Sequence, residues 1–265
     1  MTGNVRIALG VEYDGTAYAG WQAQRSNLSI QTLLEAALRP VADESVSLIC
    51  AGRTDAGVHA RAQVTHFDTQ ARRTGRGWVL GANTNLPADI SVAWAREVPR
   101  HFHARYSAEA RTYRYQVFNR PVRAALAARG ATWIRHPLDH ERMQAAGNEL
   151  RGSHDFSAFC SSESRSGSSI RRVDELTVRR EEDLIIIEVT ANAFLHHMVR
   201  NIAGTLIAVG QGEADALEVR RMLRSKDRGQ AGPTAPAQGL YLWSVRYPWA
   251  FALPPPRSAI IAPLS

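Results

Sequence analysis

The stretch AGRTDAGVHAR, residues 51–61, separates two segments that have the composition of β-strands. Ser45–Cys50 precedes it and Ala62–Asp68 follows it, so we expect a β-loop-β unit. Gly52 and Gly57 favour a tightly folded loop, because glycine permits conformations and close approaches that other residues do not. The polar stretch is therefore predicted to be a compact loop between two strands in the first half of the chain.

A strand and a helix are predicted before this unit, and a helix and a strand after it. Val5–Asp14 is a predicted strand, and Ser29 is a suitable N-cap for a helix that Pro40 is expected to end. Gly77–Asn83 predicts a short helix and Ile90–Val98 a strand. The order β-α-β-β-α-β is that of a ferredoxin-like unit.

The second half repeats this order. The predicted strands are Ser107–Phe118, Arg171–Arg180, Leu184–Ala191 and Gly239–Tyr247. The predicted helices are Asp139–Leu150, Leu195–Val209 and the short Asp215–Leu223. We therefore predict an α+β protein of two tandem ferredoxin-like, RRM-like units whose antiparallel sheets join into one extended sheet flanked by helices. The expected division is 1–104, 105–250 and a proline-rich tail, 251–265, outside the core. Arg72–Gly77 and Cys160–Ser169 are expected to be mobile loops.

Composition favours a polyanionic partner. The 265 residues carry a formal net charge of +7, and every basic residue except Lys226 is arginine. A basic surface without such a partner is the alternative. Cys50 and Cys160 have no metal-type spacing, which suits a reducing cytoplasm. We find no secretory signal and no apolar run of the roughly 18 residues that a membrane span needs.

Three segments could carry chemistry. In the 51–61 loop, Asp55 is either a charged group positioned for catalysis or binding, or a turn residue that hydrogen-bonds to its own backbone. Trp21, His59 and His66 could lie near it.

In the second segment, Arg and Tyr alternate along a strand in which Arg111, Tyr113 and Tyr115 share one face and Thr112 and Arg114 the other. This pattern is typical of a nucleic-acid platform, or of a half-buried strand with a solvated arginine face.

The third segment is FLHHMVRNIAG, residues 194–204, where His196, Arg200 and Gly204 would share one line of a helix. Arg200 lies near the helix start, where the dipole disfavours cations, so a buried carboxylate partner would explain it better than a surface position. A metal site of His196 and His197 with His101 and His103 is disfavoured, since adjacent helical residues point about 100° apart. The sequence contains neither a P-loop nor a zinc-deaminase motif.

Four segments in this order resemble the TruA family of tRNA pseudouridine synthases: VEYDGTAYAGWQ, GRTDAGVHA, FHARYSAEARTYRY and FLHHMVRNIAGTL. The resemblance extends from about Val5 to Tyr247. It implies an isomerase that converts uridine to pseudouridine at positions 38, 39 and 40 of the tRNA anticodon stem-loop. It also implies the tandem ferredoxin-like fold, a cytoplasmic homodimer, and no metal or cofactor.

The resemblance also implies roles for single residues. Asp55 corresponds to the catalytic nucleophile, Arg200 pairs with it, and Arg53 handles the flipped nucleotide. Tyr113 stacks on the target base and is a weaker candidate for general base, because a free phenol has a pKa near 10. Independently of the resemblance, the net charge and the basic segment Arg105–Arg114 predict that Arg105, Arg111 and Arg114 contact RNA.

Two other classes of protein are alternatives for this sequence. A non-catalytic RNA-binding protein of two RRM-like units would leave RNA unmodified, and the sequence lacks the RNP1-type run of such units. A metal-dependent RNA hydrolase would shorten RNA and lose activity with a chelator.

Overall fold

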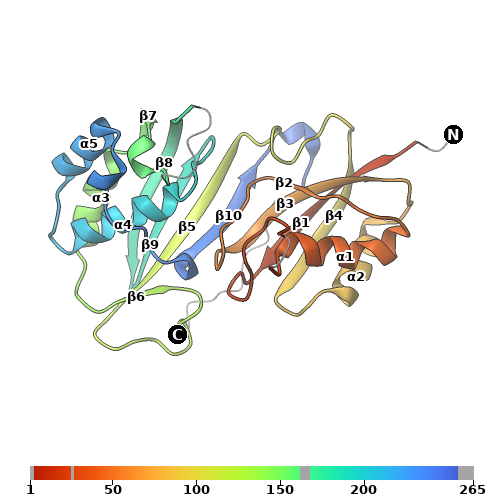
Figure 1. Cartoon of the computed structure of the whole chain (residues 1–265), viewed down its shortest axis with the longest axis horizontal. Helices are drawn as coiled ribbons and strands as arrows, with labels where there is room; N and C mark the ends of the chain where they lie inside the picture. The colour runs from red at the N-terminus through yellow and green to blue at the C-terminus, as the bar shows by residue number, and fades with distance from the viewer. Residues whose placement is uncertain (1–2, 25–26, 162–167, 256–265) are drawn as a thin grey trace. The chain divides into compact units, whose positions relative to one another are not determined.

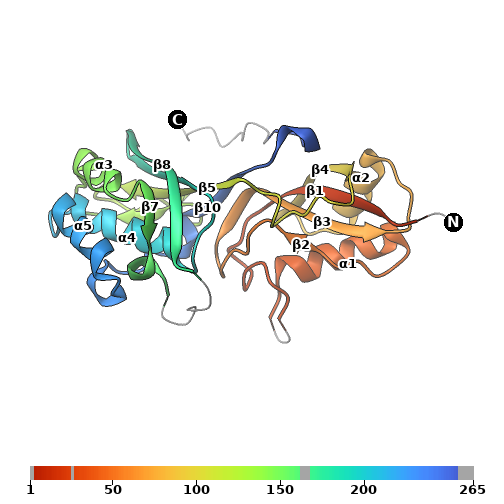
Figure 2. The same ribbon diagram turned by 90° about the horizontal axis from the view of Figure 1, so that it is seen from above.

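The computed structural model describes residues 3–24, 27–161 and 168–255. The chain divides into two compact units. Unit 1 takes the described residues of Met1–Glu109 and Leu242–Ser265, and unit 2 those of Ala110–Tyr241. Both are mixed α and β (Figures 1 and 2), which confirms the predicted α+β class with an extended antiparallel sheet flanked by helices. Within the described residues, no helix is long and apolar enough to cross a membrane.

Unit 1 has the predicted β-α-β-β-α-β order. Its strand order is β4-β1-β3-β10, with the short β2 beside β3, and β1 is antiparallel to both β3 and β4. The two helices pack against each other. The elements are β1 (Val5–Tyr13), α1 (Ile30–Ala42), β2 (Ile49–Cys50), β3 (His59–Thr69), α2 (Gly75–Asn85) and β4 (Ile90–Val98), together with β10 (Leu240–Arg246) from Leu242 onward.

Unit 2 has the strand order β5-β9-β8-β7, and its helices α3, α4 and α5 form a group (Figure 1). β9 lies antiparallel between β5 and β8, while the short β6 is parallel to β5. The elements are β5 (Ala110–Asn119), β6 (Thr132–Ile134), α3 (His140–Asn148), β7 (Gly152–Asp155), β8 (Ile170–Glu181), β9 (Leu184–Ala191), α4 (Met198–Gly210) and α5 (Ala216–Ser225).

The units end at other residues than the sequence suggested. The first unit extends to Glu109, not to residue 104, and residues from Leu242 onward belong to unit 1. Phe251 and Leu253, assigned to a tail outside the core, pack against a buried cluster of unit 1. The remainder of the predicted tail, 256–265, and most of the predicted mobile loop, 162–167, lie outside the described residues.

Helix boundaries also differ from the predicted ones, and α1 and α4 show why. Pro40 lies inside α1, which continues to Ala42 and ends at Asp43 in the left-handed conformation, φ 57°. A proline in the last turn removes only one intrahelical hydrogen bond, and the buried Leu38 and Ala42 hold that turn against the core. The helix predicted from Leu195 begins instead at Met198.

Candidate active site

The loop that carries Asp55 is fixed through its backbone. The amide of Trp21 donates to the carbonyl of Thr54 at 3.0 Å, and the amide of Val58 donates to the carbonyl of Asp55 at 3.1 Å. Gly20 has φ +93°, and a Cβ there would lie 2.6 Å from the Thr54 carbonyl oxygen. Only glycine therefore lets the Trp21 segment approach the loop this closely.

Side chains hold the same loop from β1 and β3. The hydroxyls of Tyr13 and Thr54 are 2.8 Å apart, and Nε2 of the fully buried Gln63 donates to the carbonyl of Gly52 at 2.7 Å. Thr54 is buried, whereas Asp55 is half-buried and Arg53 is exposed. The loop thus presents a carboxylate and a guanidinium on a backbone with little freedom to move.

Of the residues expected near Asp55, Trp21 contacts its loop, and each of the two histidines accepts a hydrogen bond from a backbone amide. Nδ1 of His59 accepts a hydrogen bond from the amide of Gly15 at 3.1 Å, and Nδ1 of His66 accepts one from the amide of Ala104 at 3.1 Å. Burial raises the pKa of the Cys50 thiol, at the start of the loop, to about 12. Cys50 is therefore a protonated core residue at neutral pH.

In unit 2, the predicted alternation along β5 is confirmed. Arg111 and Tyr113 lie on the buried face, and Arg114 lies on the half-exposed one. The ring of Tyr113 meets that of Phe194 edge to face, with centroids 4.9 Å apart. Nη1 of Arg111 donates to the carbonyl of Asn192 at 3.0 Å.

Arg114 is engaged by an acidic neighbour on β9. Its Nε and Nη2 donate to Oε2 of Glu188 at 2.9 and 2.8 Å. An RNA phosphate would have to compete with this carboxylate for the guanidinium. The ion pair suits the alternative of a solvated arginine face as well as it suits a nucleic-acid platform.

Arg200 lies in the first turn of α4 and holds a neighbouring segment. Its Nε donates to the carbonyl of Ala235 at 2.8 Å, and its own carbonyl accepts from the amide of Ala235 at 3.1 Å. A Cβ on Gly204, one turn further on, would lie 1.7 Å from the carbonyl oxygen of Pro233. The Arg200–Gly204 line therefore marks where the segment before β10 lies directly on α4.

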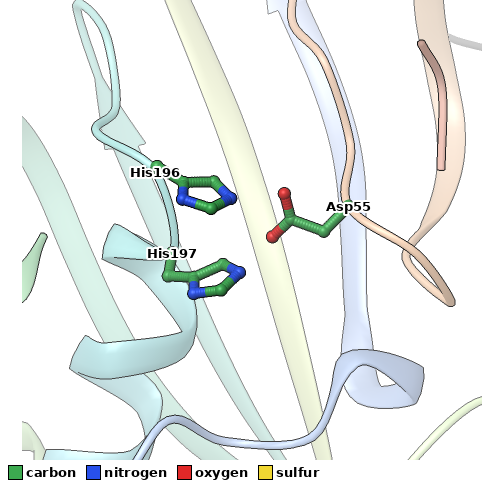
Figure 3. A group of neighbouring side chains, drawn as sticks. All are labelled: Asp55, His196 and His197. Carbon is green, nitrogen blue, oxygen red and sulfur yellow. The ribbon is translucent and has the colours of Figure 1, made fainter. Parts of the chain in front are cut away.

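The expectation that His196 shares this helical line is wrong. His197 has φ 61° and caps α4, so His196 lies before the helix. The two imidazoles stack with centroids 3.9 Å apart at 28° (Figure 3). Periodicity could not reveal this pair, because it depends on a left-handed residue that breaks the helical pattern. Figure 3 also shows the Asp55 carboxylate on its loop.

The predicted site residues thus form two groups. Asp55, Arg53 and Arg105 belong to unit 1; Tyr113, Arg200, Arg111 and Arg114 belong to unit 2. Within unit 1 the structure joins Asp55 and Arg53 on one rigid loop. Within unit 2, Tyr113 is oriented by its contact with Phe194, and Arg200 by its hydrogen bond to the carbonyl of Ala235.

Comparison with known proteins gives a consistent match. The sequence model of a family described as tRNA pseudouridine synthase matches residues 10–107 and 146–248. A protein of Methylococcus capsulatus named tRNA pseudouridine synthase A is 55% identical over 94% of this chain and 92% of its own length. Proteins of the same name from Coxiella burnetii and Legionella pneumophila are 52% identical over 94% of this chain and 95% of theirs.

One solved structure, of the archaeal box H/ACA sRNP Nop10-Cbf5 complex, is similar over 85% of this chain and 60% of that chain. The TM-score is 0.35 and the identity 8%, values too low to support an inference.

Proposed function

The chain belongs to the tRNA pseudouridine synthase family, whose members are isomerases, and from this premise we propose that it converts uridine to pseudouridine at positions 38, 39 and 40 of the tRNA anticodon stem-loop, with Asp55 as catalytic nucleophile. The observation that carries the assignment of Asp55 is its loop. A half-buried carboxylate stands on a backbone held by Tyr13, Trp21 and Gln63.

The reaction needs no cofactor. The bond between uracil N1 and the ribose C1′ breaks, a bond from C5 to C1′ forms, and the proton on C5 is replaced by one on N1. No group leaves the molecule and no electrons are exchanged. The base must first leave its stack, which costs a few kcal/mol. A carboxylate can then act as nucleophile, toward either the ribose or the uracil ring.

We assign supporting roles to three further residues. Arg200 pairs with Asp55 through the planar fork of its guanidinium, which suits a carboxylate. Its Nε bond to Ala235 supports this role by restricting how the fork can turn. Tyr113 stacks on the target uracil, and its contact with Phe194 supports this role by fixing the ring. Arg53, exposed on the Asp55 loop, handles the flipped nucleotide.

We further propose that Arg105, Arg111 and Arg114 contribute to tRNA binding, and that the enzyme works as a cytoplasmic homodimer. The net charge of +7 supports a polyanionic substrate. The buried position of Arg111 and the Glu188 contact of Arg114 make Arg105 the most accessible of the three.

The test is incubation with unmodified tRNA, with and without a chelator, followed by mapping of pseudouridine. Wild type should form pseudouridine at positions 38–40 in full-length tRNA. Asp55→Asn should fold and bind tRNA but form none. Asp43→Asn, at an exposed helix end of unit 1, is the matched control and should retain full activity. Intact, unmodified tRNA would favour a binding protein, and shortened tRNA that chelator protects would favour a hydrolase.

A further inference from the structure

Four aromatic rings in unit 1 form a column from the core to the surface. Phe102 is fully buried, and the buried His66 meets it edge to face at 5.8 Å between centroids. His103 meets His66 at 4.9 Å. Tyr106 stacks on His103 at 4.3 Å and 29°, with 76% of its own surface exposed. An exposed tyrosine is thus held in a fixed orientation from beneath.

Hydrogen bonds lock the two imidazoles of this column. Nδ1 of His66 accepts from the amide of Ala104 at 3.1 Å, and Nδ1 of His103 accepts from the amides of Arg105 and Tyr106, both at 3.2 Å. Burial is the main cause that lowers the pKa of each histidine, to about 4 for His66. Both rings are therefore uncharged at neutral pH, and the column is a rigid stack.

Residues next to the column pack near the start of the Asp55 loop. Ala104 and Ala51 pack in the same buried cluster. The charges of Arg53 and Arg105 both act on the thiol of Cys50, where they oppose the effect of burial on its pKa. The guanidinium of Arg105 also lies over the Tyr106 ring, 5.6 Å from its centroid. The tyrosine therefore has a cation next to it and belongs to the same unit as Asp55.

We propose that Tyr106 is a stacking platform for an unpaired base of the tRNA substrate, with Arg105 binding the adjacent phosphate. An aromatic face beside an arginine is the combination that holds single-stranded nucleotides. The rigid column lowers the entropy lost when a base settles on the ring. The positive surroundings favour an anionic nucleotide over an apolar protein surface. This inference rests on the proposed function and adds to it a second contact on RNA, apart from the target uridine.

The test combines changes in the protein with changes in the RNA. Binding is measured in the Asp55→Asn background, so that tRNA is not converted. Tyr106→Ala should weaken binding by about 10-fold, the scale of one stacked base. Tyr106→Phe keeps the ring and should bind within about twofold of the parent. Trp249→Ala removes another aromatic side chain of unit 1, 91% exposed, and should change nothing.

A series of tRNAs, each lacking one base at an unpaired position, then identifies the partner. At one position, loss of the base should weaken tRNA binding by about 10-fold in the protein that retains Tyr106. In the Tyr106→Ala protein, loss of the same base should not weaken binding further. Equal losses at every position in both proteins would overturn the proposal. A shift in oligomeric state on Tyr106→Ala, with tRNA affinity unchanged, would also overturn it, in favour of a protein contact.

Pseudouridine mapping with Asp55 intact keeps the two hypotheses separate. Pseudouridine without coupling between Tyr106 and any base would reject the platform and leave the proposed function standing. Coupling without pseudouridine would reject the proposed function and leave an RNA-binding platform.

Discussion

The hydroxyl groups of Tyr13 and Thr54 lie 2.8 Å apart in the interior of unit 1, so β1 is hydrogen-bonded to the residue before Asp55. The two residues are 5% and 6% exposed. The ring of Tyr13 also packs against Trp21, whose amide holds the carbonyl of Thr54. Thr54 is therefore fixed at both its side chain and its main chain, and it transmits that constraint to the neighbouring carboxylate.

Removing both of these hydroxyls should cost less than the sum of the two single removals. Tyr13→Phe leaves a buried hydroxyl on Thr54 without this partner, a change worth about 1–3 kcal/mol in the free energy of unfolding. Thr54→Val should cost a similar amount, and the double variant should cost less than the sum. Urea unfolding of the four proteins gives the coupling energy. Additive losses would show that the two hydroxyls act independently.

Turnover should respond more strongly than stability to the same changes. A small displacement of Asp55 lowers kcat without weakening tRNA capture, because most affinity comes from phosphate contacts. Single-turnover rates should fall by about 10-fold or more in Tyr13→Phe, with Kd for tRNA unchanged. A weaker Kd with an unchanged rate would place the hydrogen bond in binding instead.

Arg200 should be hard to replace, even with another cation. If its fork supports the half-buried Asp55 carboxylate, Arg200→Ala should reduce turnover steeply, because the carboxylate loses the partner that orients it. Lysine retains the charge but has neither the fork nor the Nε that donates to Ala235. Arg200→Lys should therefore restore little activity in a single-turnover assay. Near-normal turnover of the lysine variant would contradict a bidentate pair.

His66 should make the protein less stable in mild acid. Burial, and then the charges of Arg6 and His103, lower its pKa to about 4, whereas an unfolded histidine has a pKa near 6.5. Since the unfolded chain binds the proton more readily, this contribution to stability is complete above about pH 6.5 and is lost as pH falls toward 4. The loss should amount to about 3 kcal/mol at most.

His66→Asn is the matched variant for this prediction. An asparagine oxygen can accept from the Ala104 amide in place of Nδ1, but it does not titrate in this range. The free energy of unfolding of wild type should therefore fall more steeply than that of the variant between pH 6.5 and 4. If urea unfolding gave parallel curves of stability against pH for the two proteins, His66 would not be the cause of the loss of stability in acid.

Much of the fold could be predicted because local composition and global pairing agree in many elements. Ile90–Val98 and Leu184–Ala191 are strands with the predicted bounds. Other features depend on contacts that a single sequence does not show. Nothing in Leu242–Arg246 indicates that the end of β10 belongs with the first unit, and the three- and four-residue strands β6 and β7 are too short for a periodic pattern.

The site could be predicted less completely, and for physical reasons. The 51–61 stretch and its resemblance to a family identify the Asp55 loop, but not the side chains that hold it. Nothing in the sequence distinguishes Gln63 from any other polar residue of a strand, and only the fold brings its side-chain amide to the carbonyl of Gly52. The ion pair of Arg114 likewise depends on the register in which Arg114 opposes Glu188, 74 residues away in the chain. Residue types indicate chemistry, whereas partners follow from strand pairing.

That ion pair allows a direct test of whether Arg114 binds RNA. If the guanidinium contacts a phosphate, Glu188 competes for it, so Glu188→Gln should strengthen tRNA binding while Arg114→Gln weakens it. On log–log axes of affinity against salt, wild type should give a slope of magnitude about 3 or more, and Arg114→Gln should flatten it by about one unit. If Arg114 only joins β5 to β9, both variants should lose stability and keep the wild-type slope. Opposite effects of the two substitutions on affinity cannot arise from a weakened sheet, because both remove the same ion pair.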